Sequence, residues 1–342
     1  MLTSKLSYLL LPFCIFFLLS PPLTAVPEEE LVARFPEIRE FFASGVDGFF
    51  PSNQDMKVHY RYFVHPQEKM KIVVLPGRTE SIFKYEELAF DFYQRGYSVY
   101  LIDWPGQGFS GRYIKDPHRG HVTDYVEYRR ALELYINLIL ETHANTAGPE
   151  QERPNLVAMA HSMGANILSL YLIDYPKQFH RAILSSPMLD IPTPIPPRLA
   201  WFILRIIEAL GFEEAYLFGH RPFQKDEENR VTSSKIRRER ELNWRIANPQ
   251  ATIGGVTMSW ARASLEATWQ MRRDAERLTT PTLMLQAHQD EIVNVAGQDY
   301  VCEHAPNCRK LEFSDARHEI LQETDRIRDR AMKAIFEFLE ND

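Results

Sequence analysis

The chain has 342 residues, of which 45% are hydrophobic and 25% are charged, with a net charge of −7. Such a length and composition are typical of a globular protein with one large core. The acidic balance and the lack of a long basic segment argue against nucleic acid as a partner.

The first 25 residues have the layout of a secretory signal peptide. Lys5 is the only charged residue before Glu28, an apolar segment covers residues 6–19, and a stretch of prolines and small residues ends at Ala25. These are the parts of a cleavable leader, so we predict that residues 1–25 are removed and that the protein is exported, periplasmic or secreted. The apolar segment is short for a membrane span of about 20 residues. An uncleaved N-terminal anchor in the inner membrane is the alternative.

Strand and helix patterns alternate from about residue 56 onward, which favours a doubly wound, mainly parallel sheet in a single domain over residues 26–342. Residues 57–64 predict an early strand that we expect to be antiparallel. Residues 71–76 predict the next strand, followed by a loop at Gly77. The backbone N–H of Arg78 is a candidate donor of an oxyanion hole. An ordinary β-turn is the alternative.

Residues 98–103 predict a strand that leads into the glycine-rich turn 105–111. This turn lacks the G-x-G-x-x-G motif that opens a helix at a dinucleotide site, so we do not interpret it as a cofactor site. A long amphipathic helix is predicted over residues 123–142.

The stretch AHSMG at residues 160–164 places Ser162 between a short apolar strand and a helix with apolar residues at helical spacing. This is the geometry of a G-x-S-x-G nucleophile elbow, with alanine in place of the first glycine. The amide of Met163 would be the second oxyanion donor. A serine hydroxyl needs a base within hydrogen-bond reach, so the interpretation depends on a histidine and an acid further along the chain.

A helical lid is predicted between Pro187 and about Arg277, after the strand at residues 179–185. It opens with a proline-rich connector, which is followed by an apolar helix over residues 198–211. Trp201 and Phe202 are candidate acyl-binding residues on this helix. Either the helix packs on the body, or part of it stays exposed to acyl chains or to a bilayer, as a peripheral membrane contact. The charged segment 224–245 is expected to be a solvated face.

The acid and the histidine follow two later strands. Asp290 comes after the predicted strand 281–287, and His318 comes after the predicted strand 309–313. The order serine, acid, histidine is that of an α/β-hydrolase. His318 would take the proton of Ser162, and Asp290 would orient the imidazole. Glu291 is the competing acid.

Two cysteines remain in the mature chain, Cys302 and Cys308, since Cys14 would leave with the leader. In an oxidising compartment such a pair suggests a disulfide, and two unpaired thiols are the alternative. The histidines lack the spacing of a zinc site, and we expect neither a metal nor another cofactor.

Several segments together resemble the bacterial lysophospholipases, a group related to the monoacylglycerol lipases. They are residues 75–81 (LPGRTES), 84–88 (KYEEL), 103–111 (DWPGQGFSG), 116–122 (DPHRGHV) and 160–164 (AHSMG). The resemblance covers roughly residues 35–340. It implies an α/β-hydrolase fold and a serine esterase with a lid that acts on single-chain acyl lipids. Monoacylglycerol lipases usually read H-G-x-G-E-H-S, from which this chain departs at Pro76, Thr79 and Ser81.

The sequence therefore predicts a serine carboxyl-ester hydrolase that acts on lysophospholipids or monoacylglycerols through an acyl-enzyme. A serine peptidase of the proline-iminopeptidase type and an acyltransferase share the expected triad and are the alternatives. A peptidase would need a carboxylate for the amino terminus of its substrate, whereas a lipase would need an apolar tunnel. A non-catalytic relative would have no need for an intact elbow, acid, histidine and oxyanion loop.

Overall fold

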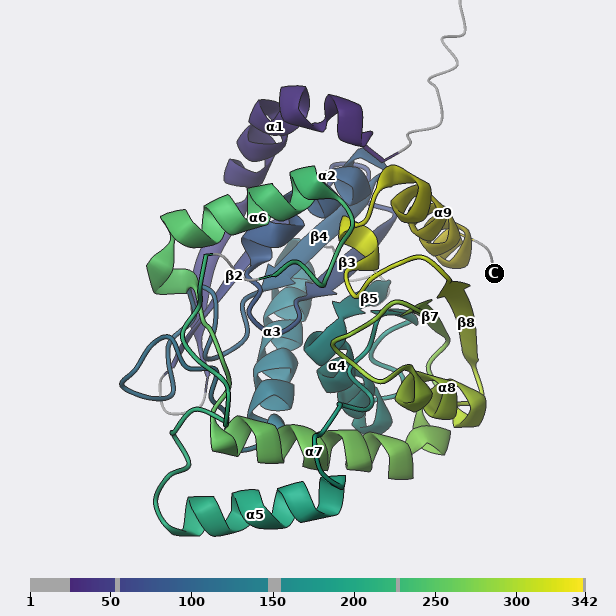
Figure 1. Ribbon diagram of the computed structural model, residues 1–342. Helices are drawn as coiled ribbons and strands as arrows, with labels where there is room; N and C mark the ends of the chain where they lie inside the picture. The colour runs from purple at the N-terminus through teal and green to yellow at the C-terminus, as the bar shows by residue number, and fades with distance from the viewer. Residues whose placement is uncertain (1–24, 53–55, 147–154, 226–227, 341–342) are drawn as a thin grey trace, which may run out of the picture.

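The structure is a computed structural model that describes residues 25–52, 56–146, 155–225 and 228–340 (Figure 1). The predicted leader lies outside the described residues except for Ala25, and Cys14 lies outside them as well. Among the helices within these ranges, none is long and apolar enough to cross a membrane.

An eight-stranded sheet runs through the described chain in the order β1-β2-β4-β3-β5-β6-β7-β8. From β4 to β8 every neighbouring pair is parallel, whereas β1 and β2 pair in antiparallel fashion at one edge. The predicted doubly wound, mainly parallel sheet and its antiparallel early strand are thus confirmed. The strands are β1 (Val46–Pro51), β2 (Lys57–Phe63), β3 (Met70–Leu75), β4 (Tyr97–Ile102), β5 (Leu156–His161), β6 (Arg181–Ser185), β7 (Thr282–Ala287) and β8 (Cys308–Phe313).

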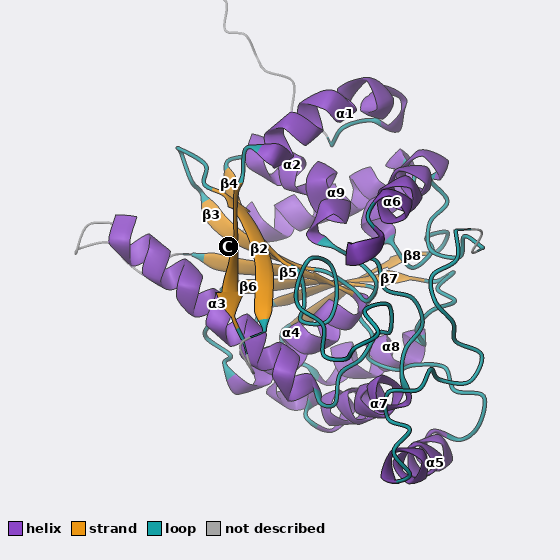
Figure 2. Cartoon of the chain, turned by 90° about the vertical axis from the view of Figure 1, so that its left-hand side faces the viewer, coloured by secondary structure: helices purple, strands orange, loops and turns teal. Residues whose placement is uncertain are grey.

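Helices cover both faces of the sheet (Figure 2). The strand side chains alternate between two buried clusters: Val73 and Leu75 belong to one, and Ile72 and Val74 belong to the other. Apolar residues on both sides of a strand are what a sheet between two helical layers requires. One layer holds α1 (Glu28–Ala43), α2 (Glu86–Gln94) and α9 (Asp325–Glu340), and the other holds α3 (Tyr125–Thr146), α4 (Ser162–Asp174) and α8 (Val295–His304).

The strand order places a crevice at the carboxyl end of β3. From β3 the chain crosses to β4 on one side and later returns to β5 on the other side. The loops that leave β3 and β5 therefore diverge, and such switch points are where open α/β sheets bind ligands.

Short 3-10 helices adjoin several loops: η2 (Ile82–Tyr85), η3 (Pro249–Ala251), η4 (Ala275–Arg277) and η5 (Ile320–Gln322).

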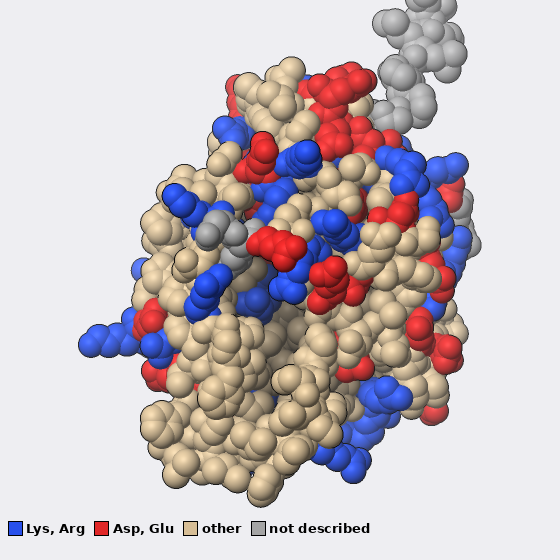
Figure 3. Space-filling view, in the orientation of Figure 1, with Lys and Arg blue, Asp and Glu red and all other residues tan. Residues whose placement is uncertain are grey.

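Three helices lie between β6 and β7, in the segment for which a lid is predicted. They are α5 (Pro197–Ala209), α6 (Lys235–Ala247) and α7 (Met258–Arg273). α7 packs on α4, and α5 packs on α7 through Leu204, Met258 and Leu265. α6 lies at the opposite side, in front of α2 (Figure 1). The surface is hollowed between α6 and the pair α5 and α7 (Figure 3).

The expectation that residues 224–245 form a solvated face holds for Lys225, Glu228 and Glu239, which are exposed, but is wrong for one side of α6. Arg237 and Arg240 of α6 are buried. Arg237 pairs with Glu87 of α2 at 2.9 Å, and Arg240 pairs with the same carboxylate at 3.1 Å. A buried charge is stable only with such a partner. The partner lies about 150 residues away in the chain, so local charge density could not reveal it. α6 is therefore clamped to the body by ion pairs.

Candidate active site

The chain turns sharply at Ser162, between the end of β5 and the start of α4. Ser162 has a φ of 51°, in the left-handed region that is costly for residues other than glycine. The turn brings α4 so close to β3 that a Cβ on Gly164 would lie 2.3 Å from the carbonyl oxygen of Pro76. Only glycine fits there, which explains the last position of the elbow motif.

Ser162, His318 and Asp290 form one hydrogen-bonded chain. The Nε2 atom of His318 lies 2.9 Å from Oγ of Ser162, and its Nδ1 atom lies 2.7 Å from Oδ2 of Asp290. An ionised carboxylate can only accept, so Nδ1 carries the hydrogen and Nε2 is left to accept from the serine. The structure thus brings together three residues that the sequence spreads over 156 positions.

The Asp290 carboxylate is held in its charged form. Burial favours its neutral form, but the hydrogen bond from His318 and the backbone N–H groups of Ile292 and Val293 lower its pKa below the ordinary value. Glu291, the competing acid, has an exposed side chain. The hydrogen bond to His318 is accepted by Asp290.

The predicted oxyanion donors lie just after the carboxyl ends of β5 and β3. Met163 is the second residue of α4, and Arg78 lies in the loop after β3. The guanidinium of Arg78 donates to the carbonyl of Gly254 at 2.8 Å and lies over the ring of Trp260. The side chain therefore contacts the segment that begins α7. A role for Arg78 in an oxyanion hole would fall to its backbone N–H, as the sequence analysis expected.

Glu80 fixes the loop that carries Arg78. Its carboxylate accepts the N–H of Gly77 and the hydroxyl of Tyr85, each at 2.5 Å, and it pairs with Lys84 at 2.8 Å. The attraction of Lys84 outweighs burial and lowers the pKa of Glu80 well below its ordinary value. These contacts hold the loop after β3 in place and favour the charged form of Glu80.

Lys84 links this loop to the segment that carries the histidine. Its Nζ atom lies 2.5 Å from Glu319, the residue after His318, and 3.8 Å from Glu241 of α6. Burial raises the pKa of Glu319 in spite of this contact. Sequence reasoning missed this cluster, although the four-residue spacing of Glu80 and Lys84 is a pattern that favours side-chain pairing.

Trp201 and Phe202, the candidate acyl-binding residues, point in different directions. The indole of Trp201 donates to Glu266 of α7 at 2.6 Å and packs beside Leu204. Phe202 is 57% exposed. Consecutive residues on a helix differ in direction by about 100°. Trp201 therefore lies at the interface of α5 and α7, whereas Phe202 faces solvent.

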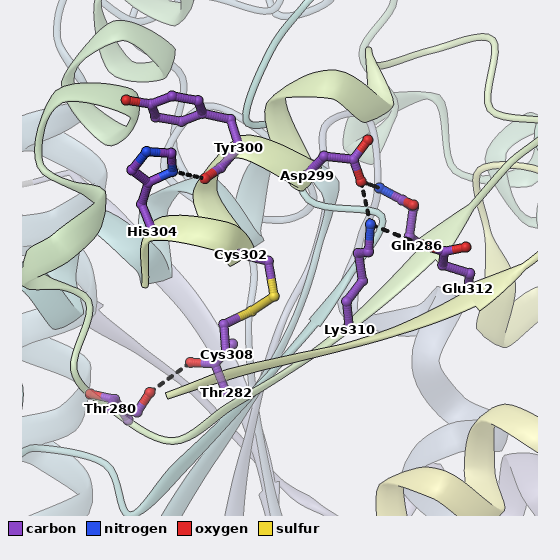
Figure 4. The surroundings of a disulfide bond; sticks show 10 residues. All are labelled: Thr280, Thr282, Gln286, Asp299, Tyr300, Cys302, His304, Cys308, Lys310 and Glu312. Atoms are coloured by element: carbon purple, nitrogen blue, oxygen red, sulfur yellow. Dashed lines mark hydrogen bonds and ion pairs between the residues drawn. A yellow bond between two sulfur atoms is a disulfide. The ribbon is translucent and has the colours of Figure 1, made fainter. Parts of the chain in front are cut away.

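Cys302 and Cys308, whose pairing the sequence leaves open, are joined by a disulfide in the structure (Figure 4). The bond joins the end of α8 to the start of β8. Beside it, Asp299 of α8 pairs with Lys310 of β8. α8 follows the loop of Asp290, so these contacts fix the helix behind the acid. Within the described residues, no group of His, Cys, Asp and Glu side chains is arranged to hold a metal ion.

Comparison with known proteins gave one family and a set of relatives. The model of the family described as serine aminopeptidase, S33, matches residues 66–325. Probable lysophospholipase L2 of Haemophilus influenzae is 31% identical over 89% of this chain and 95% of the relative. Lysophospholipase L2 of Escherichia coli K12 is 33% identical over 88% and 89%. A soluble variant of monoglyceride lipase from Saccharomyces cerevisiae superposes with a TM-score of 0.68 and 15% identity, over 87% of this chain and 96% of that chain.

Proposed function

Since the chain belongs to the lysophospholipase-like and monoglyceride-lipase-like α/β-hydrolases of the serine aminopeptidase S33 family, we propose that it hydrolyses carboxyl esters of single-chain acyl lipids with Ser162 as the nucleophile. The observation that carries this proposal is the unbroken hydrogen-bonded chain from Ser162 through His318 to Asp290. The ester hydrolase class follows from the family, and the roles of the individual residues are the proposal.

The reaction proceeds through an acyl-enzyme. Ser162 attacks the ester carbonyl while His318 takes its proton, and the imidazolium is stabilised by the Asp290 carboxylate. The backbone N–H groups of Met163 and Arg78 donate to the oxyanion. His318 then gives the proton to the leaving alcohol, and water repeats the sequence to release the fatty acid. An acyltransferase would differ only in that a second alcohol replaces water in this last half.

Lysophospholipids are the substrate class that the relatives favour. The two lysophospholipase relatives match at 31% and 33% identity, whereas the monoglyceride lipase of Rattus norvegicus matches at 25% over 74% of this chain. Aminopeptidase activity is the other candidate, because the matching family is described as serine aminopeptidase, S33. An aminopeptidase needs a free carboxylate to bind the amino terminus of its substrate. Glu80 and Glu319, the buried carboxylates beside the triad, are both paired with Lys84. This pairing supports the ester hydrolase.

A peripheral membrane contact through α5 belongs to the same proposal. Large apolar side chains of α5 and the residues after it are exposed along one side: Leu199, Phe202, Ile206, Leu210 and Phe212. The surface over α5 carries few charged atoms (Figure 3). Exposed apolar patches of this kind mark interaction sites. A lysolipid lies in a membrane or a micelle. If α5 entered the surface of that membrane or micelle, the hollow between α6 and the pair α5 and α7 would lie close to the substrate.

Export is proposed on two grounds. The leader-like segment at residues 1–25 is one. The other is the disulfide between Cys302 and Cys308, since such bonds persist in oxidising compartments.

The test is a substrate panel on purified residues 26–342. It compares lysophosphatidylcholine, monoolein, p-nitrophenyl butyrate and proline p-nitroanilide, with lysophosphatidylcholine also supplied together with an acceptor alcohol. We expect the highest kcat/KM on lysophosphatidylcholine, with release of free fatty acid. Ser169→Ala is the matched control for Ser162→Ala, because Ser169 is a buried serine of the same helix that donates to Ala165. If proline p-nitroanilide were the one substrate cleaved, the protein would be a peptidase and the proposal of an ester hydrolase would be wrong.

A further inference from the structure

The first described residues are built into the body of the protein. Ala25 is 8% exposed and Val26 is 2% exposed. The backbone N–H of Val26 donates to Oδ1 of Asp91 at 3.4 Å. Two residues later, the N–H of Glu28 donates to Asp325 at 2.7 Å. The chain thus enters the fold at a fixed and buried position between α2, α6 and α9.

This position lies in a cluster of buried charges. Arg328 of α9 bonds to Asp91 at 2.6 Å and lies 3.4 Å from Glu87. Arg237 of α6 bonds to Glu87 and to Asp325, and one of its N–H groups donates to the carbonyl oxygen of Val26. The charged groups that face Val26 or line the small cavity beside it are Asp91 and Glu87 on α2, Arg237 on α6, Arg328 and Asp325 on α9, Arg34 on α1 and Arg95 after α2.

Asp91 is less well compensated by these arginines than Glu87 is. Glu87 lies within 3.5 Å of three arginines, and its pKa is lowered to about 2 even though burial opposes its charge. Burial raises the pKa of Asp91, although Arg328 and the amide of Val26 act in the opposite direction. One more cation beside Asp91 would offset the burial.

The predicted leader ends at the bond that precedes this amide. Cleavage after Ala25 adds water across the Ala25–Val26 peptide bond: the Ala25 carbonyl gains the hydroxyl and leaves as a carboxylate with the leader. The Val26 nitrogen gains the hydrogen and takes up a proton from solution, so it becomes an ammonium. A single N–H donor near Asp91 is thereby replaced by a cation with three donors.

We propose that Asp91 is the receptor for the mature N-terminus, and that leader removal creates a buried ion pair between the α-ammonium of Val26 and the Asp91 carboxylate. A cavity of about 40 Å³ lined by Val26, Arg34 and Asp91 has room for a water that accepts from the ammonium. The proposal is independent of which ester the enzyme hydrolyses.

The pH dependence of stability separates an ion pair from simple packing. An α-amino group has an ordinary pKa of about 7.7–8.0, and Asp91 would raise it. A group whose pKa is raised by folding stabilises the protein fully below its unfolded pKa, and this contribution is lost as the pH rises through the folded pKa. Loss of the Ala25 methyl group, by contrast, has the same effect at every pH.

The experiment uses two mature chains that begin at Val26 or at Ala25, each also as Asp91→Asn and as the matched control Asp325→Asn. At each pH we subtract the melting temperature of the Ala25 form from that of the Val26 form. We expect this difference to be ~2–4 °C smaller at pH 10.5 than at pH 7. Asp91→Asn should abolish this change, and Asp325→Asn should keep it. The intact mass of the exported protein should correspond to a start at Val26.

Three results would overturn the proposal. They are a difference between the two forms that does not vary with pH, a pH-dependent difference that survives Asp91→Asn, and an exported protein that starts at another residue. If Asp91→Asn does not fold, the pH series on the two unsubstituted forms still decides between an ion pair and packing.

Discussion

Replacing Phe202 with alanine should weaken binding to lipid vesicles without slowing hydrolysis of a soluble ester. Full burial of a phenylalanine side chain contributes ~1.5–3 kcal/mol, and 57% of Phe202 is exposed in the described chain. Transfer of that exposed part into a bilayer would therefore contribute ~0.9–1.7 kcal/mol, which corresponds to a change of about 4- to 18-fold in a dissociation constant.

The assay is sedimentation of the mature chain with vesicles of phosphatidylethanolamine and phosphatidylglycerol, together with kcat/KM on p-nitrophenyl butyrate. Phe49→Ala is the matched control, because Phe49 is 52% exposed and lies on β1, away from α5. Phe202→Ala should raise the vesicle dissociation constant by the stated factor and leave butyrate hydrolysis unchanged. Equal binding by the wild type and by Phe202→Ala, or an equal loss in Phe49→Ala, would refute a docking role for α5.

Three further changes test the site. Ser162→Ala should abolish ester hydrolysis and labelling by a fluorophosphonate while the circular dichroism spectrum stays unchanged; residual activity within tenfold of wild type would exclude Ser162. Asp290→Asn should lower kcat by ~10⁴, the cost of a wrong imidazole tautomer in a related triad, whereas Glu291→Gln should have little effect, and the reverse order would assign the acid to Glu291. Lys84→Met should cost ~3–5 kcal/mol in urea unfolding. The cost should be larger at pH 8 than at pH 5, because loss of the lysine raises the pKa of the buried carboxylates of Glu80 and Glu319, which are then neutral only at lower pH; an equal loss at both pH values would argue against buried charge as the cause.

The disulfide has a calculable contribution, which gives one more test. Closing the loop between Cys302 and Cys308, which are six positions apart, removes enough chain entropy to stabilise the fold by about 2 kcal/mol. For a chain of this size we expect replacement of both cysteines by serine to lower the melting temperature by about 3 °C. Reductant should lower the melting temperature of the wild type equally and leave the variant unaffected, and a wild type insensitive to reductant would contradict the pairing.

The parts of the site that sequence predicted are those with local signals. The elbow is recognisable because a strand, a tight turn and a helix around Ser162 follow one another without interruption. Asp290 and His318 follow β7 and β8, two neighbouring strands of a parallel sheet, so topology alone brings them to the same edge. The prediction of these positions required the order of the strands but no knowledge of any side-chain contact.

Contacts between side chains that are far apart in the chain could not be predicted from the sequence. Arg237 looks like a surface residue in a charged segment, and only the approach of α2 turns it into a buried partner of Glu87. Trp201 and Phe202 look equivalent, and only the position of α7 decides which of them is covered. The local pattern predicts the helix that carries Trp201 and Phe202, but in both cases the neighbouring element determines the environment of each side chain.

The unequal attachment of α5 and α6 to the rest of the protein has a consequence for divergence among relatives. Substitutions in α6 disturb buried charges that also hold α2 and α9, so selection for a stable fold constrains them. The outward side of α5 consists of exposed side chains. Substitutions there leave those buried charges in place, so a lineage that meets a new lipid surface can adapt on this side of α5 while its catalytic machinery stays unchanged.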